Sequence, residues 1–518
     1  MSQKRIIPSG WRSLSLLATA AVLIAAQWLL AAPGHAQPFT SPRDPKTFNW
    51  RDLKQELNNK MTGTYTVAAM GDVLWRMPIG QRISPQLRDA MRNADTTIGN
   101  LEGYIIDERN CVDPCSFSGS WMPRDAAKGY ADLGFDFLAP GEFYNGIAGH
   151  TSTVKYLAEV GIKMAGAGAN LTIARHPAFQ ELPQGRVAMV HACPGTNLCG
   201  PPAGDGTASG RPASPGVNPL GLTTWNTVTA EQFAQLKAIR DSILARRNEP
   251  DVLIPSDVPK DEPGRMRLLG TNYMIGERPG EFHYEMNHND EQAQALAVRN
   301  AKELADFVIF SMHVHLNRYA FQAYSQDNYP ADFMRPLLHK LIDNGADMYV
   351  GHGNHTIQGI EIYKGRPIFY NLGNIGASRY GGDYSPPNAE NLTAFEREEY
   401  RRDYIQQQQN SEAILALSKY QDGKLVEIRI YPATLGLVEQ PLDQRRPLSR
   451  TNIPQTPSPE KAREILTKLQ KYSEPFGTKI SIEDNIGVIR VPPEATVEVG
   501  GDLVISGRGP DSRPPRRE

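Results

Sequence analysis

Short apolar runs alternate with helical stretches along most of this chain, and this alternation constrains the fold more than any other feature. Each run has the length of a buried strand and ends at a glycine or a polar residue. Strands are predicted at residues 65–70, 96–100, 135–139, 187–191, 307–312 and 347–350. Helices are predicted between some of them, for instance over residues 291–305 and 333–344. Alternating strands and helices predict an α/β fold.

The 518-residue chain is long enough for one large domain with extensions, because a domain typically has roughly 100–200 residues. A net charge of −2 gives no electrostatic argument for nucleic-acid binding, so no such partner is expected. Gly, Pro, Ala and Ser become frequent after residue 194, which indicates a long inserted segment. The predicted parts are a leader (1–36), a linker (37–63), the domain (64–435) with its insertion (194–289), a C-terminal extension (436–491) and a mobile tail (492–518).

The N-terminus has the order of a secretory signal. Basic residues Lys4, Arg5 and Arg12 precede an apolar stretch over residues 14–30, and small residues follow up to Ala36. The alternative is an uncleaved membrane anchor, because the apolar stretch approaches the roughly 18 residues needed to span a bilayer. Both interpretations predict a periplasmic or extracellular location for the rest of the chain.

The four cysteines lie in two close pairs, Cys111 with Cys115 and Cys193 with Cys199. Turn-forming residues separate the members of each pair, and an oxidising compartment favours two local disulfides. A four-cysteine zinc site is the alternative, although its pair spacing is usually tighter and more regular.

Side chains that bind metals follow four of the predicted strands. They are Asp72, Glu102, His313 and His352, with His355 three residues further on. Alone, each would be explained as a helix cap, a turn residue or an ordinary hydrogen-bonded side chain. In α/β folds, however, ligands bind beyond the carboxyl ends of the strands, so the repeated placement predicts one shared site. Carboxylates with imidazoles suit Mn, Fe or Zn rather than Ca, and such a site can promote hydrolysis of a phosphate ester.

Several motifs in this order resemble the CapA family, which is associated with poly-γ-glutamate capsule biosynthesis. The motifs occupy residues 71–74, 100–103, 166–171, 311–313, 345–355 and 358–374. The last two are long and specific, and the resemblance extends from about residue 65 to 432. It implies a calcineurin-like metallophosphoesterase fold, in which two packed mixed sheets are flanked by helices. It also implies a role in making, exporting or anchoring the polymer, with membrane-associated capsule machinery as a partner. Asn100 is expected beside the metal ligands.

The chain departs from the family pattern at two places. The family usually has Asn-Asn-His and then Asp after its third strand, where this chain has Pro140-Gly141-Glu142-Phe143-Tyr144-Asn145. Glu142 could replace a missing ligand or acid, or the site could have lost one metal. The family's Trp-Gly after the strand histidine is Val314-His315 here. If the strand continues, His315 lies on the same side as His313 and could replace the absent histidine as proton donor.

Two functions remain open at the level of the sequence. One is a metal-dependent hydrolase that acts on a phosphoester or on an anionic polymer. The other is a scaffold that binds, exports or anchors the polymer and has lost its chemistry. Basic residues at the same edge, such as Lys364, Arg366 and Arg379, would suit a polyglutamate ligand, although on a surface they are more often solvated charges.

Overall fold

In the computed structural model of the chain, all the described residues belong to one compact unit. They are residues 59–75, 78–107, 121–141, 146–195, 199–246, 262–316, 318, 328–376, 411–435 and 453–492. The predicted leader therefore lies outside the described residues, as do Glu142 and the pair Cys111 and Cys115. Among the helices that are described, none is long and apolar enough to cross a membrane.

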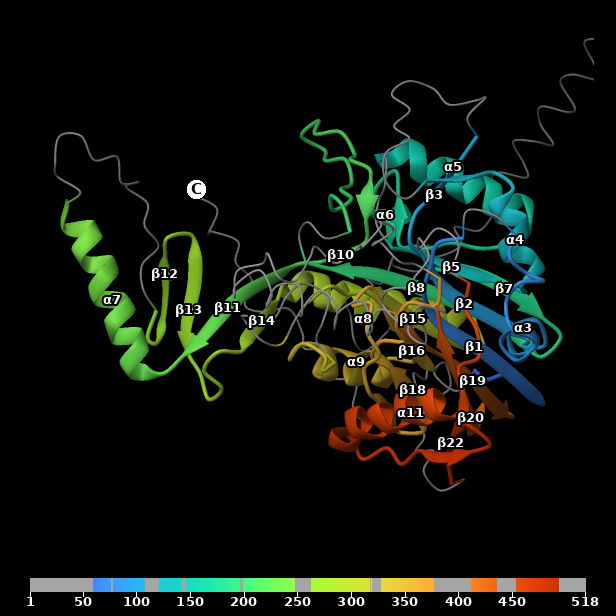
Figure 1. Cartoon of the computed structure of the whole chain (residues 1–518). Helices are drawn as coiled ribbons and strands as arrows, with labels where there is room; N and C mark the ends of the chain where they lie inside the picture. The colour runs from blue at the N-terminus through green and yellow to red at the C-terminus, as the bar shows by residue number, and fades with distance from the viewer. Residues whose placement is uncertain are drawn as a thin grey trace, which may run out of the picture. The chain divides into compact units, whose positions relative to one another are not determined.

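The first of two large sheets has seven strands and brings together the beginning and the end of the described chain (Figure 1). In spatial order they are β21 (Ser481–Glu483), β22 (Ile486–Arg490), β20 (Lys424–Thr434), β19 (Glu412–Gln421), β1 (Thr64–Val73), β2 (Thr96–Leu101) and β5 (Phe137–Pro140). β1, β2 and β5 are parallel, whereas β19 runs antiparallel to β1. The segment predicted as a C-terminal extension contributes the two strands β21 and β22 at one edge.

The second large sheet also has seven strands. They are β10 (Pro219–Leu220), β8 (Gly185–Pro194), β15 (Phe307–His313), β16 (Met348–His352), β18 (Arg366–Phe369) and β17 (Ile360–Tyr363), with β7 (Ala178–Leu182) paired to β8. β8, β15, β16 and β18 are parallel, and β17 forms an antiparallel hairpin with β18. Lys364 and Gly365 form the turn of this hairpin.

Alternate side chains along each strand enter two different hydrophobic cores, one on each face of the sheet. One of these cores lies between the two sheets, and the other lies under the helices. On β1, Val67 and Ala69 face the core between the two sheets, while Ala68 and Met70 face helices. On β15, Phe307 and Ile309 face the core between the sheets, and their neighbours face the helices on the other side. Because both faces of each sheet are buried, the strands read as continuous apolar runs. The predicted fold of two packed mixed sheets flanked by helices is confirmed.

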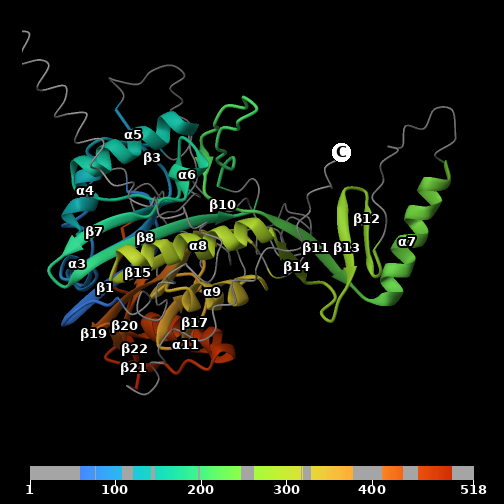
Figure 2. The ribbon, with the colours of Figure 1, turned by 180° about the vertical axis from the view of Figure 1, so that it is seen from behind.

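The helices cover the outer faces of the two sheets (Figure 2). Over the first sheet lie α3 (Pro85–Arg92), α4 (Ala126–Asp132) and α5 (Gly146–Glu159), and over the second lie α8 (His288–Leu304) and α9 (Met334–Asp343). Helix α11 (Pro459–Ser473), followed by the 3-10 turn η5 (Glu474–Phe476), packs against the core between the sheets. Smaller elements are β3 (Tyr104–Ile106) paired with β4 (Trp121–Pro123), β6 (Ala167–Gly168) paired with β9 (Gly216–Val217), and α6 (Leu171–Ala174).

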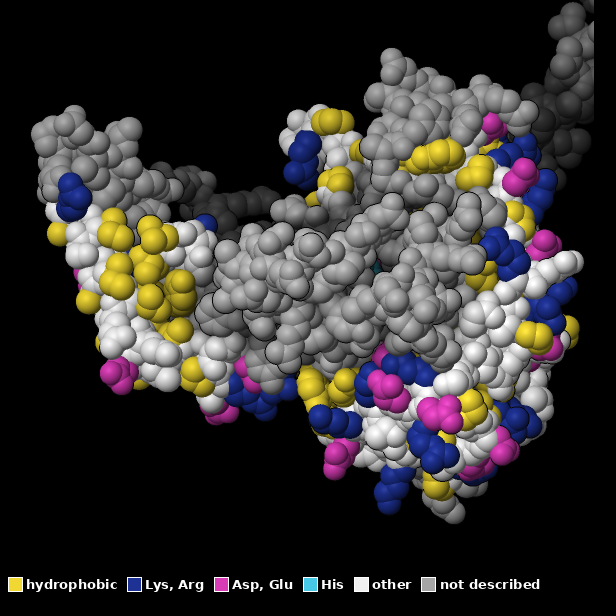
Figure 3. All heavy atoms as spheres, in the orientation of Figure 1, with side chains coloured by type: hydrophobic (Ala, Val, Ile, Leu, Met, Phe, Trp, Pro, Cys, Tyr) yellow, Lys and Arg dark blue, Asp and Glu magenta, His cyan; other side chains and the backbone are white. Residues whose placement is uncertain are grey.

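Most of the predicted insertion forms a small sheet of its own, which we call the lobe (residues 222–286). Its strand order is β12 (Arg265–Leu268), β13 (Thr271–Ile275), β11 (Leu222–Val228) and β14 (Phe282–Met286), and α7 (Ala230–Ala245) lies beside β12 and β13 (Figure 1). Thr229 begins α7 with a capping box that includes Gln232, so the helix start is specified locally. Within α7 only Arg240 is buried, and Figure 3 shows hydrophobic side chains gathered on the surface of the lobe.

Candidate metal centre

The predicted metal ligands meet where parallel strands of both sheets end. Asp72 lies near the end of β1 and pairs in register with Asn100 of β2. His313 ends β15 and His352 ends β16, and these two residues pair directly with each other. β1 and β16 are in contact, so the polar residues at the ends of these strands lie close together although they belong to different sheets. Glu102 follows β2 by one residue.

Asp72 is fully buried and is held by hydrogen-bond donors from two directions. Its Oδ1 accepts a hydrogen bond from Asn100 Nδ2 at 2.6 Å. Both of its oxygens lie 3.2 Å from the backbone N–H of Gly353. Gly353 has a φ of +96°, and an added Cβ would lie 3.1 Å from His313 Nδ1. A glycine is therefore needed where the backbone approaches both the carboxylate and the imidazole.

Three imidazoles form a buried chain that is centred on His313. Its Nδ1 lies 2.9 Å from Nδ1 of His352, and its Nε2 lies 2.7 Å from Nε2 of His315. The other ring nitrogen of His352, Nε2, lies 2.8 Å from the hydroxyl oxygen of Ser311. On its outer side, the His352 ring stacks on His191 with 5.4 Å between ring centroids and 10° between planes.

Glu102 lies against two of the histidines on the other side of this chain. Its Oε1 lies 3.6 Å from His313 Nε2 and 3.5 Å from His355 Nε2. His355 has a φ of +59°, a left-handed conformation that is uncommon for a residue other than glycine and that tends to occur at functional sites. Space beside Glu102 depends on Gly141, where an added Cβ would lie 2.9 Å from Glu102 Oε2 and 3.0 Å from Asn100 Nδ2.

Burial controls the charge of the cluster. It lowers the pKa of His313 and His352 well below the usual range, and the neighbouring histidines lower it further. Burial also raises the pKa of Asp72 to about 7, with a contribution from the charge of Glu102. Uncharged imidazoles offer a lone pair to a cation, and buried carboxylates gain from a positive charge between them. The electrostatic setting therefore favours a bound cation.

The donor set fits a divalent metal. Three overlapping groups each place their ligand atoms within 4.8 Å of one another: Asp72 with His313 and His352, Glu102 with His313 and His315, and Asp72 with Glu102 and His355. In the part of the chain that the structure describes, Oδ1 of Asn100 is buried without a hydrogen-bond partner. Buried polar atoms normally have a partner, so this oxygen is suited to a ligand. Carboxylate and imidazole donors together suit Mn, Fe or Zn.

Comparisons with known proteins agree with this arrangement of motifs. The model of the bacterial capsule synthesis protein family PGA_cap matches residues 66–378, which is more than half of the chain. The chain belongs to this capsule synthesis family. The uncharacterized protein y4sH of Sinorhizobium fredii is 32% identical over 474 residues, which cover 85% of this chain and 96% of that protein. The PGA biosynthesis protein CapA of Bacillus subtilis is 39% identical over 78 residues, 15% of this chain and 18% of CapA.

One solved structure, a putative 5'-nucleotidase from Staphylococcus aureus, aligns with 9% identity and a TM-score of 0.33, covering 79% of this chain and 58% of that one. At this level of similarity the likeness carries no functional argument. The resemblance to the CapA family is confirmed by the family match, and the fold is metallophosphatase-like as predicted.

The predicted metal ligands that lie within the described residues are all brought together in the structure. Asp72, Glu102, His313, His352 and His355 all contribute to the three groups of possible ligands, and Asn100 contacts Asp72. His315 reaches the same place although β15 ends at His313 and the strand does not continue. Glu142 lies outside the described residues, so its predicted role stays a prediction.

Three residues beside the site were given no role there by the sequence. Ser311 and His191 contact His352, and Asn374 forms a bridge with Asp72. His191 belongs to no recognisable motif, so the sequence assigns it no role. Its position becomes visible only when β8 pairs with β15, which places His191 opposite Ser311. Burial lowers the pKa of His191 to about 3, so this ring is uncharged.

The predicted disulfide between Cys193 and Cys199 is present, and it lies beside the candidate site. Cys199 Sγ is 3.6 Å from the backbone oxygen of His313. By contrast, two of the basic residues suggested for polymer binding are engaged elsewhere. Arg366 forms an ion pair with Asp347 at 3.1 Å, and Lys364 forms one with Asp343 at 2.6 Å. Both residues lie at the turn that begins β18, and because β18 is parallel to β16 this is the opposite end of the strands from His352. They are therefore poor candidates for holding a polymer at the candidate site, and Arg379 lies outside the described residues.

Proposed function

We propose that this member of the capsule synthesis family is a metal-dependent hydrolase that acts on a phosphoester or on the capsule polymer or its carrier. The observation that supports this most strongly is the overlap of the three ligand groups, which share Asp72, Glu102 and His313. Shared ligands between neighbouring groups are the arrangement expected for one or two metal ions in hydrolytic sites. Mn, Fe and Zn all suit the donors.

Each residue has a proposed task. Asp72, Glu102, His313, His352 and His355 would hold the metal, which when bound would polarise the scissile group and activate water. Asn100 orients the Asp72 carboxylate through its 2.6 Å hydrogen bond. His315 is the proposed proton donor to the leaving group, because its ring lies against His313 and it is the histidine nearest to the metal ligands that the family motif does not assign. Glu142 stays a second candidate for this role.

We also propose an extracytoplasmic location. The basic and apolar order of residues 1–36 supports a secretory signal, with an anchor over residues 14–30 as the alternative. A disulfide between Cys193 and Cys199 agrees with an oxidising compartment. There the substrate would be an anionic polymer or a phosphoester, close to membrane-associated capsule machinery.

The alternative is a scaffold that retains the fold without the reaction. The absence of the family's Asn-Asn-His sequence from residues 140–145 favours this alternative. The buried, unpartnered Oδ1 of Asn100 among the described residues favours metal binding instead. Under either proposal the protein takes part in capsule polymer synthesis, export or anchoring.

The deciding experiment is elemental analysis of the purified mature protein beside the variant His352→Ala. We expect about stoichiometric Mn, Fe or Zn in the wild type and its loss in the variant, because one ligand of a buried site is removed. A matched control is His339→Ala, a partly buried histidine on α9 that is bonded to Glu361. If the wild type contains no metal even after reconstitution, the hydrolase proposal fails. If metal is present, phosphoester substrates are then screened.

A further inference from the structure

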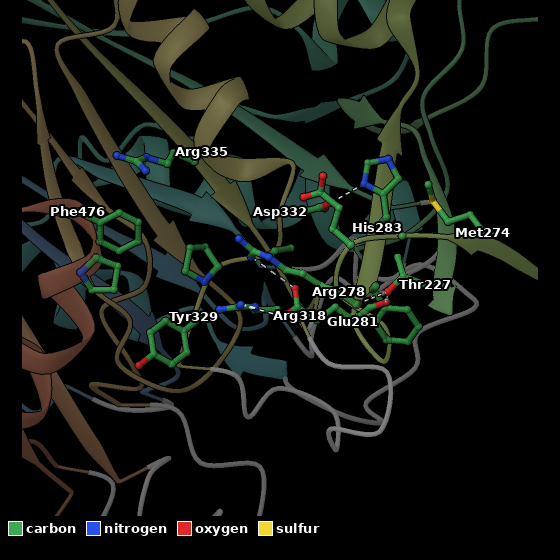
Figure 4. A pocket seen from close by; sticks show the side chains of 16 residues that line it. Thr227, Met274, Arg278, Glu281, His283, Arg318, Tyr329, Asp332, Arg335 and Phe476 are labelled. Atoms are coloured by element: carbon green, nitrogen blue, oxygen red, sulfur yellow. Dashed lines mark hydrogen bonds and ion pairs between the residues drawn. The ribbon is translucent and has the colours of Figure 1, made fainter. Parts of the chain in front are cut away.

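A pocket of about 660 Å³, the lobe pocket, lies where the lobe meets the two-sheet body (Figure 4). Arginines and carboxylates balance in its lining, and the arginines are already paired. Arg318 donates to Glu281 at 2.8 Å, and Arg278 lies 3.7 Å from the same carboxylate. Arg335 donates to Glu361 at 2.9 Å. Paired charges of both signs select no charged ligand, so nothing in the lobe pocket identifies what it binds.

His191, beside the candidate metal centre, has a more specific environment. Val187 and Met189 precede it on the same face of β8 and belong to the core between the two sheets. β8 pairs with β15 so that His191 is opposite Ser311, and His313 follows on the same face of β15. On both strands the apolar side chains of this face therefore give way to polar ones near the carboxyl end. His191 is 2% exposed, so it belongs to the buried part of the centre.

The hydrogen bond of the His191 ring determines which nitrogen carries its proton. The ring is bonded to the backbone of Pro140, and a proline backbone has no N–H, so the carbonyl of Pro140 accepts this hydrogen bond. In the described part of the chain, Nδ1 is buried without a hydrogen-bond partner, so Nε2 is the donor. Nδ1 therefore keeps its lone pair. Histidines that bind metals usually have this arrangement, in which the other ring nitrogen donates to a backbone carbonyl or a carboxylate.

Neighbouring groups hold the His191 ring in one orientation. Gly166 has a φ of +101°, and a Cβ added there would overlap Cδ2 of His191. The face of the ring stacks on His352, with 5.4 Å between ring centroids and 10° between planes. Cδ2 and Nδ1 lie on opposite sides of an imidazole ring, so Nδ1 points away from Gly166. A ligand atom whose ring is already held by its surroundings is well placed to bind a metal.

The surroundings of His191 favour a cation as the partner of Nδ1, because buried polar atoms normally have a partner. His352, which stacks on the ring, is itself a proposed ligand, and burial lowers the pKa of both histidines, so both rings are uncharged. Among the described residues, Oδ1 of Asn100 in the same centre is also buried without a partner. His191 belongs to none of the three groups of possible ligands, so it extends the donor set on the side of β8.

We propose that His191 is a further ligand of the metal centre and binds a cation through Nδ1. The proposal rests on the proposed function, because a ligand requires a bound metal. The chain departs from the family pattern over residues 140–145, and the bond to Pro140 places His191 beside the start of this stretch. A ligand that is missing from the stretch is then supplied by β8 instead.

The metal affinity of the full-length protein tests the proposal, measured by competition with a chelator for His191→Phe and His191→Ala. Phenylalanine keeps a flat ring that can stack on His352 but offers no nitrogen. We expect both variants to weaken metal binding by about 100-fold or more, because even residues that only orient a ligand change the affinity by about 10–100-fold. His176→Phe is the matched control, since His176 also bonds to a proline carbonyl, that of Pro177, but is exposed. It should leave the affinity unchanged.

The Phe variant separates a ligand from a residue that only positions His352. If His191→Phe binds metal as tightly as the wild type, the proposal is wrong, and a loss confined to His191→Ala would mean that His191 acts through its stacking alone. The visible absorption of bound cobalt(II) gives a second readout. It should change in His191→Phe, where a nitrogen ligand is lost, and stay the same in His176→Phe.

A crystal structure of the metal-loaded wild type decides the matter if neither His191 variant folds, as judged by circular dichroism. With zinc, we expect Nδ1 of His191 to lie about 2.0–2.1 Å from an ion. Ions that contact the other ligands but not His191 overturn the proposal.

Metal content and hydrolysis of a small phosphoester, measured on the same proteins, separate this proposal from the proposed function. A wild type without metal overturns both. A wild type whose metal binding does not depend on His191 overturns only the new ligand. Metal binding that depends on His191, without hydrolysis of any phosphoester, retains the ligand and overturns the hydrolase.

Discussion

The candidate metal centre and the lobe pocket are built on opposite principles. At the metal centre Asp72, His313 and His352 have no exposed surface, and strands of two sheets fix their backbones. In the lobe pocket, Arg278 and Arg335 are largely exposed, and the lobe wall comes from a small sheet whose helix buries only Arg240. Both regions hold charged and polar groups together, but only the first removes them from water.

The difference in burial determines which kind of function each region can carry. A buried polar cluster has a large desolvation cost, so its groups must be fixed and satisfied, and this rigidity suits a metal. Exposed arginines keep much of their hydration, so holding them at a surface has a small desolvation cost. Substitutions should therefore have large effects at the metal centre and between the sheets, and small effects in the lobe.

The largest effect is expected from His315→Ala in the buried centre. If His315 donates the proton, hydrolysis of a phosphoester should fall by about 10²–10⁴-fold, while the metal content stays the same. Loss of metal together with activity would make His315 a ligand instead. Unchanged hydrolysis would remove His315 from the mechanism, and Glu142→Gln would be the next variant to test.

Between the sheets, Phe307→Ala should cost about 3–5 kcal/mol of the free energy of unfolding. The Phe307 ring packs on Tyr65 with 5.1 Å between centroids and on Tyr420 with 4.9 Å, and it is buried in the core that joins the two sheets. Its removal leaves a cavity that these rings cannot fill. Urea denaturation followed by circular dichroism measures the change. A loss below about 1 kcal/mol would show that this core repacks easily.

The sequence predicted the body of the fold because both faces of its strands are buried. Runs such as residues 307–312 and 347–350 are apolar throughout, which is the pattern of a strand covered on two sides. The ligands were predictable for a related reason, since each follows such a run directly. His191 escaped prediction because its role depends on the pairing of β8 with β15, which joins segments more than 100 residues apart.

The lobe escaped prediction for the opposite reason. Its strands are short and only half-buried, so β11 and β13 lack the apolar pattern that marks a strand. The many Gly and Pro residues after residue 194 indicate a long inserted segment, and this composition alone predicts no sheet within it. The pocket at its junction combines residues from three distant segments, and only the folded chain brings them together.

A moderate effect is expected from Ser311→Ala, which leaves every proposed ligand in place. If His352 binds the metal through Nδ1, its Nε2 carries the proton and donates to Ser311 at 2.8 Å. Without the hydroxyl, metal affinity should fall by about 10–100-fold. Competition with a chelator measures the affinity, and Ser418→Ala, a buried serine on β19, is the control. Unchanged affinity in Ser311→Ala would mean that Nδ1 is not the ligand atom or that packing alone orients the ring.

The smallest effect is expected from Ile239→Ser on α7 in the lobe. This side chain is 50% exposed, and surface substitutions away from caps and cores usually change the free energy of unfolding by less than about 0.5 kcal/mol. Urea denaturation, as for Phe307→Ala, makes the contrast direct. A loss above about 1 kcal/mol would mean that Ile239 is packed against another part of the protein or a second copy. Repeating the measurement over a range of protein concentrations decides between these, because only association makes the midpoint depend on concentration.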